Sequence, residues 1–235
     1  MSFPDYAPAP NQGERPAEYE IENRAVDPDG LVLAAMRKLA PWVDRTLVDL
    51  GCGSGYWLPG YADEAAAVIG VEPDPALVPL AAARDPRVTV LPGSAEHIPL
   101  QDATVDVVHA RFAYFWPPRC EAGLAEVRRV LRPGGALVVV DNDQRSGEFA
   151  DLLAAAARLH RQGTALERAA VTDAWWAERG ASRTRVLSRW EFTSRADFET
   201  VLRMEFPGGV ADRWLAAHPG TTGLSYGYVL FCAVR

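Results

Sequence analysis

One short stretch of the chain combines the residue types that could hold a small polar cofactor. The apolar run 47–50, which carries an acid at Asp49, predicts a buried strand, and Gly51, Gly53 and Gly55 follow it. Glycine permits a positive φ and leaves no Cβ between the backbone and a ligand. A helix predicted near 57–64 would offer free N–H groups and its positive dipole end. This strand–loop–helix pattern predicts a cofactor site at the carboxyl end of the strand.

The spacing of the glycines separates two classes of cofactor. A dinucleotide-binding loop has glycines at its first, third and sixth positions, but the sixth position counted from Gly51 is Tyr56. The loop instead reads G-x-G-x-G, with an acid two residues ahead of it, and so resembles the first motif of the class I S-adenosylmethionine (SAM)-dependent methyltransferases. The resemblance implies SAM as the cofactor. It places Asp49 at the methionine end and the loop beneath it, with Gly51, Cys52, Gly53 and Gly55 as contacts.

A second acid follows the next predicted strand, 67–71. Glu72 comes about 20 residues after the glycine loop, which is the spacing at which an acid at a strand end meets a ribose. Its two carboxylate oxygens could accept both hydroxyls of a vicinal diol. A solvated acid at a strand end is the alternative, but the place of Glu72 after the loop favours the ribose role. Pro73 also resembles the turn of the family.

The segments after the third and fourth predicted strands extend the resemblance. Where the family usually has an acid that binds the adenine amino group, this chain has Ser94, whose hydroxyl can form a hydrogen bond without charge assistance. The resemblance implies that Ser94, Ala95 and Glu96 flank the adenine. It also implies that Ala110 and Arg111 line the cofactor site at the switch point of the sheet. Arg111 could instead bind an acidic substrate or pair with a nearby carboxylate.

Candidate residues for the methyl acceptor are aromatic. The aromatic residues after the fourth strand could form an apolar wall, although core packing is the alternative; they are Phe112, Tyr114, Phe115 and Trp116. Tyr19 lies in a predicted N-terminal helix and either covers the site or is a surface residue. His109 could be a general base or a structural residue. The sulfonium methyl of SAM is already activated, so positioning could supply most of the rate and no catalytic motif is required.

The order of predicted elements indicates an α/β fold. The resemblance implies a doubly wound, seven-stranded, mostly parallel Rossmann-like sheet whose last strand is antiparallel. The Leu-Arg-Pro-Gly-Gly turn at 131–135 is a second specific part of it, and Pro133 should end the preceding helix. N-terminal helices and a helical insert at 206–223 are expected to form a lid. Asp29 is expected to cap a helix over 30–39.

The length of the chain suits one domain. With 235 residues, we expect a single methyltransferase domain over 1–235. Its expected parts are an N-terminal arm with cap helices (1–40), a SAM-binding core (41–143), and a helical segment with closing strands (144–235). No long apolar run or signal peptide is recognisable, so a cytoplasmic protein without membrane association is expected.

Charge and cysteine content narrow the possible partners. The formal net charge of −7 argues against general nucleic-acid binding, and three scattered cysteines give no metal-site spacing. The sequence thus predicts methyl transfer from SAM to an oxygen, nitrogen or carbon atom of a small molecule. The alternatives are a non-catalytic SAM-binding regulatory or scaffold subunit and a nicotinamide-dependent oxidoreductase. The sequence does not distinguish a monomer from a homodimer.

Overall fold

The computed structural model describes residues 3–4, 6, 11–159, 164–206 and 208–235. The strands are β1 (Thr46–Leu50), β2 (Ala67–Glu72), β3 (Val88–Pro92), β4 (Val105–Arg111), β5 (Leu131–Asn142), β6 (Ser182–Glu191) and β7 (Gly223–Val234). The helices are α1 (Pro16–Ala25), α2 (Leu31–Leu39), α3 (Leu58–Ala62), α4 (Val78–Ala82), α5 (Glu121–Val130), α6 (Glu148–Leu159), α7 (Ala165–Glu178), α8 (Arg195–Glu205) and α9 (Val210–Ala217).

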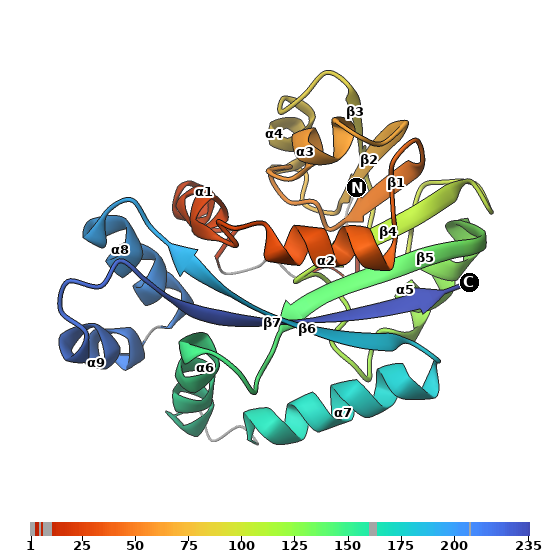
Figure 1. Ribbon diagram of the computed structural model, residues 1–235. Helices are drawn as coiled ribbons and strands as arrows, with labels where there is room; N and C mark the ends of the chain where they lie inside the picture. The colour runs from red at the N-terminus through yellow and green to blue at the C-terminus, as the bar shows by residue number, and fades with distance from the viewer. Residues whose placement is uncertain (1–2, 5, 7–10, 160–163, 207) are drawn as a thin grey trace.

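A single seven-stranded sheet organises the molecule (Figure 1). The strand order is β3-β2-β1-β4-β5-β7-β6, and β1 lies between β2 and β4. Neighbouring strands from β3 to β5 are parallel, whereas β7 is antiparallel to both β5 and β6. The chain reverses its direction of winding at β1 and β4, which is the switch point where such sheets bind ligands. The predicted doubly wound sheet with an antiparallel last strand is confirmed.

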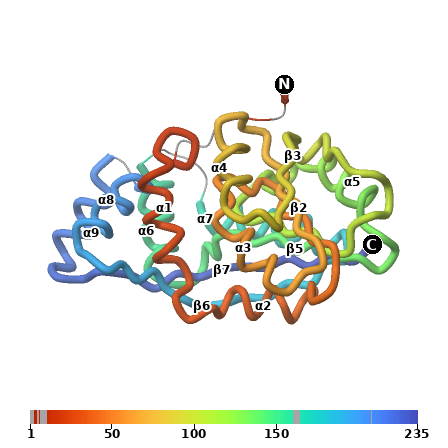
Figure 2. The backbone as a smooth tube through the Cα atoms, turned by 90° about the horizontal axis from the view of Figure 1, so that it is seen from above, coloured from red at the N-terminus to blue at the C-terminus, as the bar shows by residue number. Residues whose placement is uncertain are grey.

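Helices cover both faces of the sheet and divide the core in two. One buried cluster joins the strands to α2 and α3, and the other joins them to α5 and α7. Seen from above, α2 and α5 lie on opposite sides of β5 (Figure 2). Because side chains alternate along a strand, Leu47 faces the α2 side and Val48 faces the α5 side.

The same alternation places three charged residues on one face. Leu47, Val68 and Val107 all belong to the cluster on the α2 side. Counting by twos along β1, β2 and β4 from these residues reaches Asp49, Glu72 and Arg111, each at or next to the carboxyl end of its strand. The fold thus brings two acids and one cation together at the switch point.

The start of α2 corrects one sequence prediction. Asp27, not Asp29, caps this helix: its carboxylate accepts hydrogen bonds from the backbone N–H groups of Leu31 (3.0 Å) and Val32 (2.8 Å). Gly30 adopts a left-handed conformation with φ +67°, and this turn brings Asp27 back over the helix end. Asp29 instead forms an ion pair with Arg189.

The N-terminal segment is fixed to the far edge of the sheet. Val26 forms an isolated antiparallel bridge with Trp190 of β6, and the backbone N–H of Asp27 donates to the carbonyl of Arg189 (3.2 Å). The Ser188 hydroxyl also donates to Asp27 (2.6 Å). These contacts hold α1 over the carboxyl edge of the sheet, beside α8 (Figure 1).

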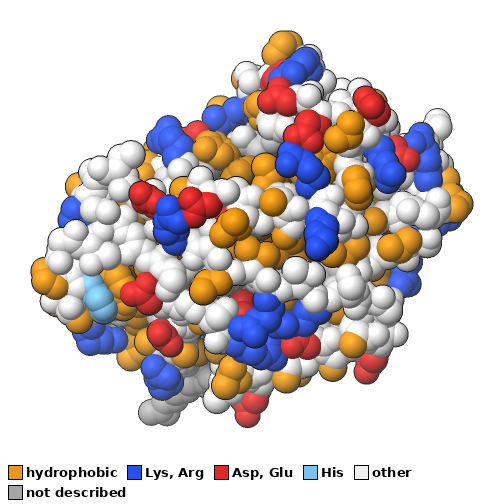
Figure 3. Space-filling model, in the orientation of Figure 1, with side chains coloured by type: hydrophobic (Ala, Val, Ile, Leu, Met, Phe, Trp, Pro, Cys, Tyr) orange, Lys and Arg blue, Asp and Glu red, His pale blue; other side chains and the backbone are white. Residues whose placement is uncertain are grey.

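The surface and the helices provide two further observations. On the face drawn in Figure 3, basic and acidic side chains lie next to one another. Several such side chains form ion pairs on the surface, for example Arg37 with Glu64. None of the described helices has the length and apolar character needed to cross a membrane. The described residues also contain no group of three or more His, Cys, Asp or Glu side chains arranged to hold a metal ion.

Candidate functional site

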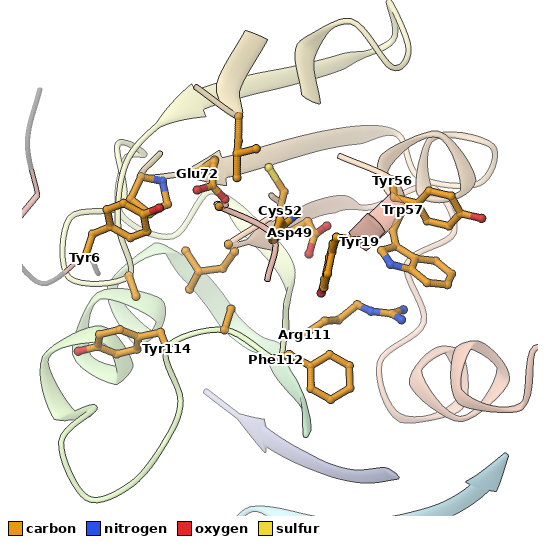
Figure 4. A pocket seen from close by; sticks show the side chains of 18 of the residues that line it. Tyr6, Tyr19, Asp49, Cys52, Tyr56, Trp57, Glu72, Arg111, Phe112 and Tyr114 are labelled. Carbon is orange, nitrogen blue, oxygen red and sulfur yellow. The ribbon is translucent and has the colours of Figure 1, made fainter. Parts of the chain in front are cut away.

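A cavity of about 430 Å³ lies at the carboxyl ends of β1, β2 and β4. Its wall combines the loops after these strands with the N-terminal arm and α1 (Figure 4). Eleven of the residues predicted from the sequence to form the site line it: Tyr19, Asp49, Gly51, Cys52, Glu72, Pro73, Ser94, Ala95, Arg111, Tyr114 and Trp116. Gly53, Gly55, Glu96, Ala110 and His109 do not line it.

The Glu72 carboxylate is held by the backbone. One oxygen accepts from the N–H of Gly53 (2.7 Å) and the other from the N–H of Asp74 (2.9 Å). Glu72 is buried, and burial raises its pKa. Each carboxylate oxygen has a second lone pair, so both oxygens can still accept a ligand hydroxyl. The position of Glu72 is therefore fixed before a ligand binds.

The glycine loop has a conformation that other residues would strain. Gly51, Gly53 and Gly55 have φ of +75°, +57° and +77°. A Cβ at Gly55 would lie 2.7 Å from the Cα of Ala81, so this glycine allows the loop to pack on α4. At Gly53 a Cβ would overlap the Gln12 side chain. Gly53 and Gly55 thus shape the loop, whereas Gly51 and Cys52 face the cavity.

Asp49 is a buried acid that accepts no hydrogen bond from any described residue. It lines the cavity, and burial raises its pKa to about 7 although the charge of Arg111 acts in the opposite direction. Figure 4 shows its carboxylate beside Tyr19, with the Arg111 side chain passing below. A cationic amino group placed here would satisfy the carboxylate and stabilise its charge.

Arg111 is a cation with an aromatic neighbour. Its guanidinium carbon lies 3.8 Å from the centroid of the Trp57 ring, a cation–π contact. Among the described residues it forms no ion pair within 4.0 Å; it donates to the Met36 sulfur at 3.8 Å and also interacts with the hydroxyl of Tyr61. The guanidinium therefore keeps donors for a carboxylate ligand.

The opposite end of the cavity contains the predicted adenine residues. Ser94 and Ala95 are buried and line it. Glu96 instead accepts a hydrogen bond from the Tyr114 hydroxyl (2.7 Å), and that hydroxyl accepts from the N–H of Gly123 (3.1 Å). Glu96 thus orients Tyr114, whose ring lies near Tyr6 at this end (Figure 4).

His109 lies in the core and not in the cavity. Its ring is fully buried and makes edge contacts with Trp42 (5.2 Å) and Tyr61 (5.1 Å) between ring centroids. Neither ring nitrogen has a hydrogen-bond partner among the described residues. Burial lowers its pKa to about 3, so the ring stays neutral at physiological pH.

Several lining residues were not predicted from the sequence. Tyr6, Gln12, Glu22 and Trp57 all line the cavity. Trp57 directly follows the glycine-loop segment, so its position gave a signal. Of the predicted aromatic wall, Phe112 also lines the cavity, whereas Phe115 does not. No sequence pattern predicts a role in the site for the N-terminal residues, because only the packing of the arm against the glycine loop brings them there.

The fold and the cavity define a SAM-binding α/β domain of the class I type, and comparisons with known proteins agree. Residues 48–139 match the family described as "Methyltransferase domain". A methyltransferase of Mycobacterium bovis is 38% identical over 116 residues, which are 48% of this chain and 47% of that protein. A malonyl-[acyl-carrier protein] O-methyltransferase of Serratia marcescens is 33% identical over 92 residues, 39% of this chain and 36% of that protein.

Solved structures extend the likeness over most of the chain. The YcgJ protein of Bacillus subtilis superposes with a TM-score of 0.58 at 16% identity, covering 88% of this chain and 98% of that one. A geranyl diphosphate methyltransferase in complex with SAM superposes with a TM-score of 0.54 at 18% identity. The match covers 95% of this chain and 87% of that one.

Residues 48–139 form a methyltransferase domain of the class I SAM-dependent type, and the comparisons support SAM as its cofactor. The sequence matches span less than half of the length of each of the two curated relatives named above. The predicted family and cofactor are confirmed.

Proposed function

We propose that this protein transfers a methyl group from SAM to an oxygen, nitrogen or carbon atom of a small molecule. One observation carries the proposal. One cavity joins the backbone-anchored Glu72 to Asp49 and Arg111 and continues to aromatic residues of α1 and of the segment after β4. Cofactor and acceptor could thus share one volume that excludes water.

The donor set of the cavity fits SAM. Glu72 would accept the ribose hydroxyls, while Ser94 and Ala95 would contact the adenine. Asp49 would receive the amino group of the methionine part, and Arg111 its carboxylate. Pro73, Gly51 and Cys52 would complete the wall. When bound, SAM supplies an activated methyl group, so the protein needs to orient the acceptor at attack distance. Tyr19, Tyr114 and Trp116 are the proposed acceptor contacts.

The first test is calorimetric titration with SAM, S-adenosylhomocysteine and NAD. We expect the first two to bind and NAD not to bind, because the loop lacks the dinucleotide spacing. Glu72→Ala should weaken SAM binding more than tenfold, since two hydrogen bonds to a charged group are lost. Glu178→Ala, the same change at an exposed end of α7, is the control. Unchanged SAM affinity in a folded Glu72→Ala protein would contradict the ribose assignment.

The alternative is a non-catalytic SAM-binding subunit. His109 is buried away from the cavity, and no other described residue shows a general-base geometry that would decide the question. Formation of S-adenosylhomocysteine in the presence of an acceptor separates the two possibilities. Binding without turnover over a panel of amines, alcohols and carbon acids would favour the subunit.

A further inference from the structure

The cavity is lined by one carboxyl group that the proposed cofactor contacts do not use, that of Glu22, which interacts with a second acid, Glu205, outside the lining. Glu22 of α1 lines the cavity and is 9% exposed. Its Oε2 atom is buried and has no hydrogen-bond partner among the described residues. Glu205, the last residue of α8, is the charged group that acts on Glu22, and both pKa values are raised, first by burial. An unpartnered carboxylate oxygen facing a cavity indicates a missing ligand donor.

The surroundings of the pair contain few donors. Asn11 donates to Glu205 Oε1 (2.8 Å), and Asn11 and Asn23 line the same part of the cavity. From β7, the hydroxyl of Tyr226 donates to Asn142, so this tyrosine is already occupied. The remaining groups that interact with the pair are neutral phenols, Tyr19 of α1 and Tyr228 of β7.

No cation neutralises the pair. Neither Glu22 nor Glu205 forms an ion pair with a described residue, and Arg111 does not contribute to the pKa of either carboxyl group. Arg111 instead acts on Asp49, and the other lining cation, Arg119, is exposed. The buried Glu22 and the half-buried Glu205, which have no counter-ion among the described residues, favour a positively charged ligand, because the charge of a carboxylate is costly in a low-dielectric site.

We propose that the Glu22–Glu205 pair binds the ammonium group of the methyl acceptor, so that the substrate class is a small amine. This inference rests on the proposed function. The ammonium would donate to the Glu22 carboxylate from the cavity, and the charge of Glu205 would add to the attraction. The rings of Tyr19, Phe112 and Trp116 line the same cavity and suit an apolar or aromatic body on the amine.

Glu22 and Glu72 reach the cavity from different elements. Glu22 lines it from α1, whereas Glu72 stands at the end of β2 and lies near Tyr6 in Figure 4. The pair is therefore separate from the proposed ribose and adenine contacts. The negative charge of the pair also complements the positive charge that SAM brings with its sulfonium.

The test uses three probes of matched shape on protein saturated with S-adenosylhomocysteine: 2-phenylethylammonium, 2-phenylethanol and 3-phenylpropionate. Calorimetry should show that the ammonium binds about 10- to 100-fold more tightly than the alcohol, because a hydrogen bond to a charged group is gained. The carboxylate should bind most weakly. Glu22→Gln should remove most of the preference for the ammonium, and Glu205→Gln should reduce it.

The controls distinguish the pair from a general charge effect. Glu18→Gln removes one acid from the same helix at a position that does not line the cavity, and it should keep the full preference. Circular dichroism verifies that each variant is folded. Equal binding of the ammonium and the alcohol, or a preference that survives both glutamine substitutions, would overturn the inference while leaving SAM binding intact. Failure of S-adenosylhomocysteine to bind would refute the proposed function as well.

Discussion

Asp49→Asn should make the empty protein more stable while weakening its binding of SAM. Asp49 is 3% exposed, and burial raises its pKa from 3.8 to about 7. At 1.36 kcal/mol per pKa unit, the charged form destabilises the folded state by at most about 4 kcal/mol. Asparagine has nearly the same shape but carries no charge. The gain will be smaller than this limit, because the amide is also a polar group facing the cavity.

The sign of the effect depends on pH. A raised pKa means that the folded state binds a proton more tightly than the unfolded state does. The contribution of protonated Asp49 is therefore complete below about pH 4 and is lost as the pH rises towards about 7. Asp49→Asn should accordingly stabilise the protein little at pH 4.5 and most at pH 8. Acids such as Glu22 and Asp141 titrate in both proteins and largely cancel in the difference.

Urea unfolding of both proteins at pH 4.5 and pH 8 measures the effect. A stabilisation of about 1–4 kcal/mol at pH 8 that shrinks at pH 4.5 is expected. Titration with SAM should show weaker binding to the variant at pH 8, since the carboxylate that would receive the amino group is missing. A variant that is equally stable or less stable at pH 8 would refute the view that the buried charge of Asp49 destabilises the empty protein.

Three further substitutions test other parts of the structure. Asp27→Ala should lower the free energy of unfolding by about 1–2 kcal/mol through loss of the α2 cap, whereas Asp29→Ala should change it by less than about 0.5 kcal/mol; equal effects in thermal unfolding would contradict the cap assignment. His109→Leu should leave the pH profile of methyl transfer unchanged, because the ring is neutral and lies outside the cavity; a more than tenfold loss of turnover in the folded variant would restore a catalytic role. Gly53→Ala should weaken SAM binding, since φ is +57° and a Cβ would displace Gln12; unchanged affinity by calorimetry would show that the loop tolerates the strain.

The sheet was predictable because its signals are local. The glycine loop and Glu72 each follow an apolar run, Pro133 follows an amphipathic helix, and the chain order of such units determines a doubly wound topology. The residues that line the site at strand ends could therefore be predicted from the sequence. The structure places Asp49, Glu72, Ser94 and Arg111 around one cavity, at the edge that the order of elements indicated.

Contacts between distant segments could not be predicted in this way. Asp27 replaces Asp29 as the cap because of a left-handed glycine and a hydrogen bond to Ser188, 161 residues away. No described residue of 208–223 lines the cavity, which this part of the expected lid therefore does not cover. Instead, α9 packs beside α8 (Figure 1). Tyr6 and Gln12 of the N-terminal arm line the cavity. No periodic pattern in this part of the sequence predicts that position.

The electrostatics of the cavity connect the cofactor site with the proposed acceptor site. Asp49 and Glu22 are both buried acids with raised pKa values, and no described residue donates a hydrogen bond that would stabilise the charge of either. Such groups lower the stability of the empty protein and are stabilised only by cationic ligands. Asp49 would be satisfied by the amino group of SAM. Glu22 lines the cavity from α1, and a positively charged acceptor would supply a second cation for it.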